Sequence, residues 1–60
     1  MLNETQSIHS VIDHCRTVER DLRNIANFAE DWTAKDELTK ALQSVDVCIK
    51  QCESALHHSR

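Results

Sequence analysis

The chain has 60 residues, contains neither glycine nor proline, and carries a formal net charge of −3 with 28% charged residues. A chain of this length is one domain at most, and such a domain buries only about 60% of the surface that its unfolded chain exposes. The lack of glycine and proline disfavours tight hairpins and phosphate-binding loops and favours long helices. A mildly acidic chain has no overall attraction to nucleic acid or to anionic membranes.

The first ten residues, MLNETQSIHS, lack the basic segment and apolar run of a secretory signal. No stretch of the sequence approaches the roughly eighteen apolar residues of a membrane span. We therefore expect a cytoplasmic protein without a membrane contact. The three cysteines are an odd number without the spacing of a disulfide framework, so we expect reduced thiols.

Apolar residues recur with heptad spacing from about residue 4 to residue 30, which predicts one amphipathic helix over that range. With Ile8 at heptad position a, every a and d position from Ile8 to Trp32 is apolar. The a positions are Ile8, Cys15, Leu22 and Ala29, and the d positions are Val11, Val18, Ile25 and Trp32.

A second helix is predicted over about 35–58, in a different heptad phase. Its a positions are Leu38, Val45 and Cys52, and its d positions are Ala41, Cys48 and Ala55. Because continuing the first phase would put Asp36 and Thr39 in the core, the pattern predicts a turn over about 31–34. Thr33 followed by Asp36 suits an N-cap with an acidic partner. The expected fold is all-α, a single antiparallel helical hairpin over 1–60, and one continuous kinked helix is the alternative.

The apolar stripes of both helices are wider than a two-helix seam needs. The second helix also carries Leu42, Ile49 and Leu56 at its e positions, and stripes this wide indicate more than one neighbouring helix. We expect a homodimer that forms a four-helix bundle, and an unidentified partner protein is the other solution. The interface residues expected from this pattern are Phe28, Trp32, Leu42, Ile49 and Leu56.

Three cysteines are expected to meet in one region of the core. A turn near residues 32–34 makes the numbers of facing residues add to about 67, which puts Cys15 opposite Cys52, with Cys48 one turn away. Thiolates at i and i+4 with a third from the facing helix suit Cu(I), and His14 could add a fourth ligand for Zn²⁺. The CxxxC spacing is similar to that of thiol-rich copper-storage bundles. One alternative is that Cys15, Cys48 and Cys52 only pack as small apolar residues and that the chain holds no cofactor. The other is a redox pair, for which the i,i+4 spacing on a helix gives a marginal Cα separation.

Arg16, Arg20 and Arg23 form a basic ridge on the outer side of the first helix. Arginine pairs bidentately with phosphate or carboxylate, so the ridge could bind RNA or an acidic protein surface. In size and shape the expected hairpin resembles Rop-like bundles, and that resemblance implies RNA binding along an exposed face. The alternative is an ordinary solvated face, partly neutralised by helical pairs such as Glu19 with Arg23.

The pattern favours a small, non-catalytic interaction or regulatory module that associates with itself and docks on another macromolecule. Carboxylates spread over solvent-facing positions and the absence of an assembled Ser, His and acid set give no indication of an enzyme. A cysteine-lined Cu(I) or Zn²⁺ bundle and an RNA-binding bundle are the two alternatives.

Overall fold

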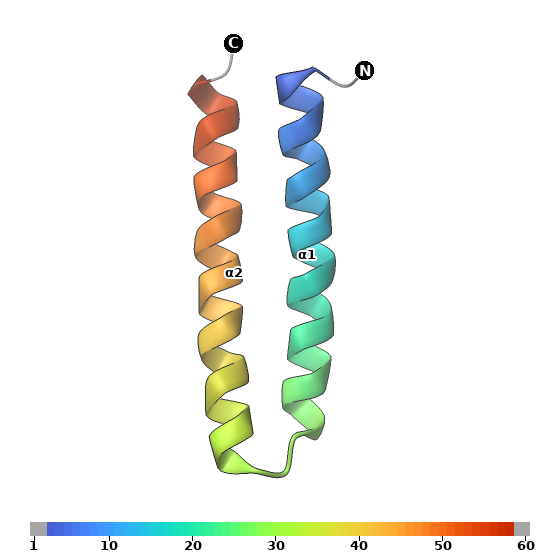
Figure 1. The fold of residues 1–60 in the computed structure, drawn as a ribbon, viewed down its shortest axis with the longest axis vertical. Helices are drawn as coiled ribbons and strands as arrows, with labels where there is room; N and C mark the ends of the chain where they lie inside the picture. The colour runs from blue at the N-terminus through green and yellow to red at the C-terminus, as the bar shows by residue number, and fades with distance from the viewer. Residues whose placement is uncertain (1–2, 59–60) are drawn as a thin grey trace.

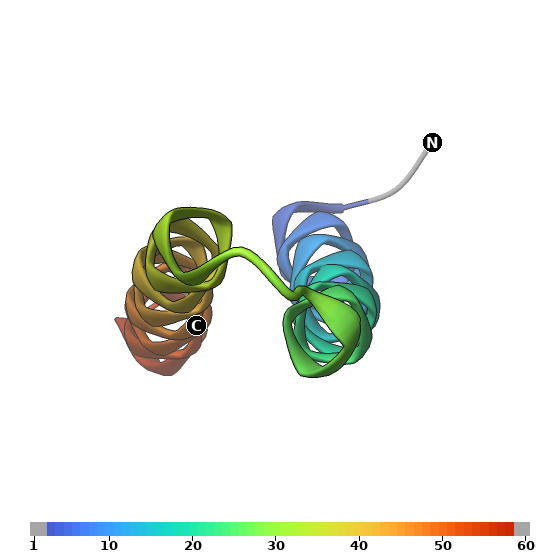
Figure 2. The same ribbon diagram turned by 90° about the horizontal axis from the view of Figure 1, so that it is seen from below.

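The computed structural model of the chain describes residues 3–58. Helix α1 spans Glu4–Phe28 and helix α2 spans Trp32–His58, and the two run antiparallel along their whole length (Figure 1). The molecule measures 45 × 19 × 12 Å, so it is a single layer of two helices, as the end-on view in Figure 2 shows. The predicted all-α hairpin is thereby confirmed, and the continuous kinked helix is wrong.

Helix α1 begins with a capping box. The backbone N–H of Gln6 donates to Oδ1 of Asn3 at 2.8 Å, and the backbone N–H of Asn3 donates to Oε1 of Gln6 at 3.3 Å. These two bonds satisfy donors that the first turn of a helix leaves without a partner.

The turn is shorter than predicted and lies earlier in the chain, over residues 29–31 instead of 31–34. Asp31 caps α2, because its Oδ2 accepts from the backbone N–H of Ala34 at 3.0 Å and its carbonyl oxygen accepts from that of Lys35 at 2.9 Å. Thr33 is therefore inside the helix, and its prediction as the N-cap is wrong. A carboxylate at the positive end of the helix is a stronger cap than a threonine hydroxyl.

A turn without glycine is possible because the chain leaves α1 in an extended conformation. Ala29 has φ −69° and ψ 127°, and no residue within 3–58 has a positive φ. Only a positive φ would have favoured glycine at this position.

The seam between the helices consists of heptad positions a and e, not a and d. Ile12, Ala26 and Ile49, all at e positions, are the three buried apolar residues of the described chain, at 4%, 9% and 7% exposure. Helix α2 turns this way because its e positions hold Leu42, Ile49 and Leu56, whereas its d positions hold only alanine and cysteine. Facing the larger side chains toward α1 buries more apolar area.

Candidate docking face

The d positions of α1 lie outside the seam and leave apolar side chains uncovered. Val11 is 46% exposed and Ile25 is 56% exposed, while Val18 between them is half-buried. These three residues recur every seven positions and so form a stripe along one side of α1. The d positions of α2, which are Ala34, Ala41, Cys48 and Ala55, form a corresponding stripe of small residues.

The two stripes share one face of the hairpin. On the other side of the seam, Nη2 of Arg16 in α1 lies 3.4 Å from Oε2 of Glu53 in α2, so that pair marks the opposite, charged face. Because each helix turns its d positions away from this pair, both d stripes lie on the remaining face. We call it the docking face and define it by Val11, Val18, Ile25, Ala34, Ala41, Cys48 and Ala55.

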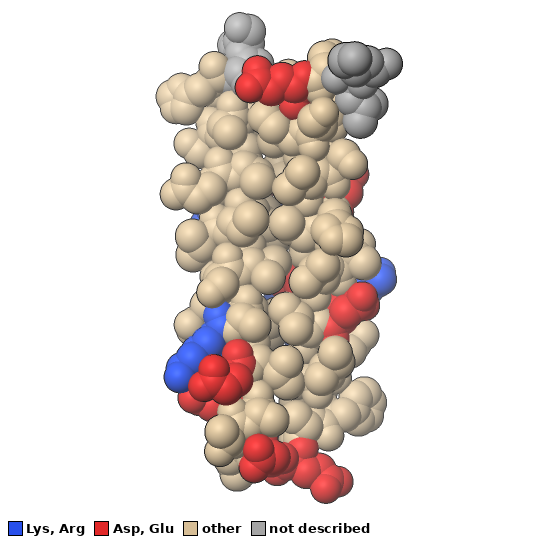
Figure 3. Space-filling model, viewed as in Figure 1, with Lys and Arg blue, Asp and Glu red and all other residues tan. Residues whose placement is uncertain are grey.

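The docking face carries few charges along its middle. Figure 3 looks onto it and shows uncharged side chains over most of the area, with red and blue side chains mainly at the two ends and along the edges. Lys40 lies at one edge, where it pairs with Asp36 at 3.2 Å and with Glu37 at 3.4 Å. The seven residues that define the face are all apolar, and the charged side chains lie largely at its margin.

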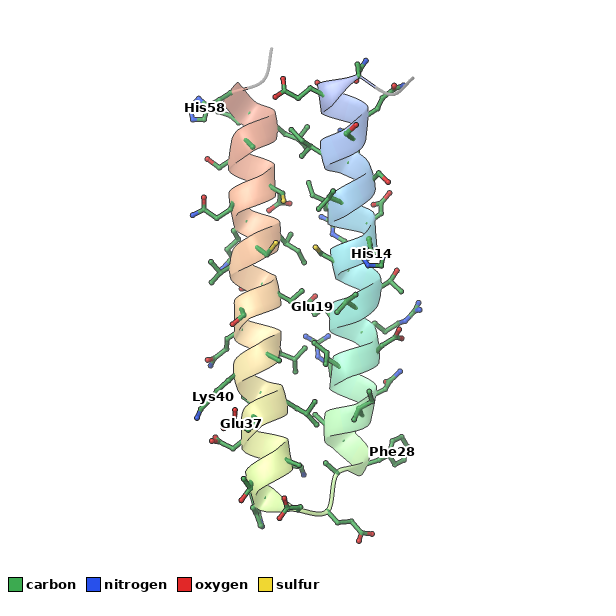
Figure 4. The ribbon with its side chains drawn as sticks, viewed as in Figure 1. His14, Glu19, Phe28, Glu37, Lys40 and His58 are labelled. Atoms are coloured by element: carbon green, nitrogen blue, oxygen red, sulfur yellow. The ribbon has the colours of Figure 1, made fainter. Side chains whose placement is uncertain are left out.

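The expected interface residues fall into three groups. Ile49 is buried inside the hairpin and Leu42 and Leu56 are half-buried in the same seam, so these three pack against α1 of their own chain. Phe28 is 85% exposed and points away from α2 (Figure 4). Trp32 is 79% exposed and lies on a different helix, where the Lys35 ammonium is 5.4 Å from its ring centroid.

Phe28 ends α1 and Trp32 begins α2, so the two aromatic side chains belong to different helices, and their part in an interface stays a prediction. Trp32 shares a seven-residue spacing with Thr39, Asp46 and Glu53, which puts it on the side of the Arg16 and Glu53 pair, away from the docking face. The residues that sequence reasoning missed are Val11, Val18 and Ile25. The heptad pattern includes them, but it assigns them to the seam.

The three thiols lie near one another, with Cys15 and Cys52 half-buried and Cys48 exposed. Cys15 of α1 interacts with both Cys48 and Cys52 of α2, and its side-chain hydrogen bond is with Cys48.

Burial raises the pKa of the Cys15 thiol, and a hydrogen-bonding interaction with Cys48 and the charges of Cys48 and Cys52 raise it further. The pKa of Cys52 is raised by burial and by Cys48. A raised pKa opposes formation of the thiolate, which is the metal-binding form. Within residues 3–58 no group of three or more His, Cys, Asp or Glu side chains is placed to hold a metal ion. Copper or zinc binding stays an untested prediction.

Two of the three ridge arginines face carboxylates. Arg16 pairs with Glu53 of the other helix, and Nε of Arg20 lies 3.6 Å from Oδ1 of Asp21. Both pairs are more than half exposed, so solvent screens them, but they offset part of the positive charge of the ridge. RNA binding through Arg16, Arg20 and Arg23 stays an untested prediction.

A surface hollow lined by Lys40, Gln43, Ser44 and Val47 lies on α2 alone. Because all four residues belong to successive turns of one helix, this hollow is a space between neighbouring surface side chains.

Neither described helix has the length of apolar sequence that crossing a membrane requires. Comparison with protein-family models, with curated proteins and with solved structures gave no match.

Proposed function

We propose that this chain is a small, non-catalytic interaction module that works by docking its uncovered apolar face and that associates with itself into a four-helix bundle. The observation that carries the proposal is the position of Val11, Val18 and Ile25, which form an apolar stripe on a face that the chain itself leaves open. Exposed contiguous apolar area of this kind marks sites of association in soluble proteins.

The surface area supports the same proposal. The chain exposes 4790 Å² at a mass of 6.9 kDa, whereas a compact monomer of this mass exposes roughly 4000 Å². The difference of about 800 Å² equals the area that each partner typically buries in a specific interface. The excess arises because a hairpin that is one layer thick covers each helix on one side only.

The small core of the hairpin also supports the proposal that the chain associates with itself. Ile12, Ala26 and Ile49 are the buried apolar residues of the described chain, and a domain near 60 residues needs more burial than this to offset the loss of conformational entropy. Docking a second apolar face would cover the flanking stripe and complete a core of bundle type.

The test compares two substitutions at equally exposed positions. Ile25 on the docking face and Val47 on the outer side of α2 are both 56% exposed, so a charge at either one has the same access to solvent in the monomer. Sedimentation equilibrium of the reduced wild-type chain should show a species larger than a monomer. Ile25→Asp should shift it to a monomer, and Val47→Asp should not.

Two results would contradict the proposal. One is a wild-type chain that stays monomeric at concentrations up to the millimolar range while its circular dichroism shows folded helices. The other is an equal loss of association in Ile25→Asp and Val47→Asp, because the docking face would then have no special part in assembly.

A further inference from the structure

We infer that the occupant of the docking face is a second copy of this chain in one orientation, with both turns at the same end of the bundle and α1 of each copy packed on α2 of the other. This inference rests on the proposed function. The two-fold axis then runs parallel to the helices, between the two docking faces. This orientation follows from the side chains that the two halves of the docking face present.

One half of the docking face is large and the other is small. Helix α1 contributes Val11, Val18 and Ile25, whereas α2 contributes three alanines and a cysteine. Large residues pack best against small ones, because the two layers then interdigitate without voids. A partner that presents small residues to α1 and large residues to α2 is therefore the best fit. A second copy does so when its α2 covers this α1.

The heights of the side chains agree with this arrangement. The ends of α1 and α2 lie at about the same heights in Figure 1, so residues of the two helices at one level have numbers that add to about 60–62. This puts Val11 near the level of residue 50, Val18 near 43 and Ile25 near 36. An axis parallel to the helices keeps these levels in the partner. Each large side chain then falls between two successive small residues of the partner's α2. The gaps, taken in order, are Cys48 to Ala55, Ala41 to Cys48, and Ala34 to Ala41.

The opposite orientation fits less well. An axis across the helices places the two turns at opposite ends, so that α1 meets α1 and α2 meets α2. Val18 and its neighbours would then meet the same large residues of the second copy, while Ala41 and Cys48 would meet small ones. Such an interface is crowded along one pair of helices and leaves space along the other, and both faults weaken packing.

A spin-label distance measurement tests the orientation. The labelled chain carries Glu30→Cys in the turn, in a background where Cys15, Cys48 and Cys52 are changed to alanine. Double electron–electron resonance should give a distance between the two labels well below half of the 45 Å length of the hairpin. A distance close to that full length would overturn the inference. The alanine background should dimerise as the wild-type chain does, because it keeps residue 48 small.

A second substitution tests the same inference in the wild-type chain, without labels. Ala41→Leu fills the space that Val18 and Ile25 of the second copy occupy, so it should weaken the dimer by at least about tenfold in dissociation constant. In the opposite orientation the same leucine would fill empty space between the two α2 helices and tighten the dimer. Ala41→Ser is the matched control of nearly unchanged size and should change the dissociation constant by less than about threefold.

The results separate the two proposals. A wild-type chain that is monomeric contradicts the proposed function and this inference together. A dimer that Ile25→Asp disrupts, but whose turns lie far apart and which Ala41→Leu tightens, upholds the proposed function and overturns this inference alone. If the alanine background does not dimerise, the sign of the Ala41→Leu effect in the wild-type chain decides the orientation.

Discussion

Nη2 of Arg16 and Oε2 of Glu53, which are 37 residues apart in the chain, lie 3.4 Å from each other across the two helices. The pair fixes which sides of α1 and α2 share a face. The pair places the basic ridge on one side of the seam and the apolar stripe of Val11, Val18 and Ile25 on the other. The hairpin therefore has one charged face and one docking face.

The Arg16 and Glu53 pair should contribute little to stability. Both side chains are more than half exposed, and exposed pairs typically contribute about 0.2–1 kcal/mol. We expect a coupling free energy in that range from a double-mutant cycle of Arg16→Gln and Glu53→Gln, measured by urea unfolding at fixed protein concentration. The coupling should fall when salt is raised to 1 M. A coupling above about 2 kcal/mol would show that the pair is shielded from solvent, for instance inside an interface.

The cap of α2 should depend on Asp31 and not on Thr33. Asp31→Ala removes the acceptor for the backbone N–H of Ala34, so it should lower the free energy of unfolding by about 0.5–2 kcal/mol. Thr33→Ala, inside the first turn, should change it by less than about 0.5 kcal/mol. Thermal unfolding followed by circular dichroism compares the two variants directly. A larger loss in Thr33→Ala would restore the cap that the sequence alone predicts.

Glu19 lies half-buried between the helices (Figure 4), at an e position that holds an apolar residue at Ile12 and Ala26. Glu19→Leu should raise the free energy of unfolding by about 0.5–2 kcal/mol, because it replaces a charged group in the seam by apolar volume. Glu37→Leu, at an exposed position, is the control and should change it little. Urea unfolding at one protein concentration measures both. A destabilised Glu19→Leu would mean that the carboxylate makes an interaction that leucine cannot replace.

The raised pKa values of Cys15 and Cys52 predict a loss of stability at alkaline pH. The folded chain keeps both thiols protonated to higher pH than the unfolded chain does. Their contribution is thus fully present below the ordinary thiol pKa of roughly 8.5, and it is lost as pH rises through the raised values. The urea midpoint of the reduced chain should fall between pH 8 and pH 10. The double variant with Cys15→Ala and Cys52→Ala should fall less over the same range.

A parallel decline in the double variant and the wild-type chain would contradict this linkage. Cys48→Ala is a useful further comparison, because removing that thiol removes a cause of the raised pKa at both of the other two positions. Its stability should therefore depend on pH less steeply than that of the wild-type chain.

The three thiols also allow a direct test of the metal hypothesis. Native mass spectrometry of the reduced chain with added Cu(I) or Zn²⁺ reports subunit number and bound metal together. If Cys15, Cys48 and Cys52 only pack, replacing all three by alanine should leave metal uptake unchanged. Uptake at a fixed stoichiometry that disappears in the triple variant would support a soft-metal site instead.

The sequence by itself determined the two helices. The 3.6-residue period of the apolar positions, the change of heptad phase between Ile25 and Leu38, and the lack of glycine and proline all act locally, and they were enough to predict an all-α hairpin. Local signals placed the turn only approximately. The sequence pattern predicted Thr33 as the cap of α2, whereas Asp31 caps it in the folded chain, and the choice depends on how the chain leaves α1 at Ala29.

Only the tertiary structure decided which part of each apolar stripe is buried. A stripe that covers positions a, d and e can face its neighbour through a and d or through a and e, and these choices differ by a rotation of the helix about its own axis. The rotation depends on the volumes that meet across the seam, where Ile12 and Ile49 are buried while Val11 and Ile25 stay exposed. Packing between residues that are far apart in the chain sets that balance, so the docking face is a property of the folded hairpin and not of either helix alone.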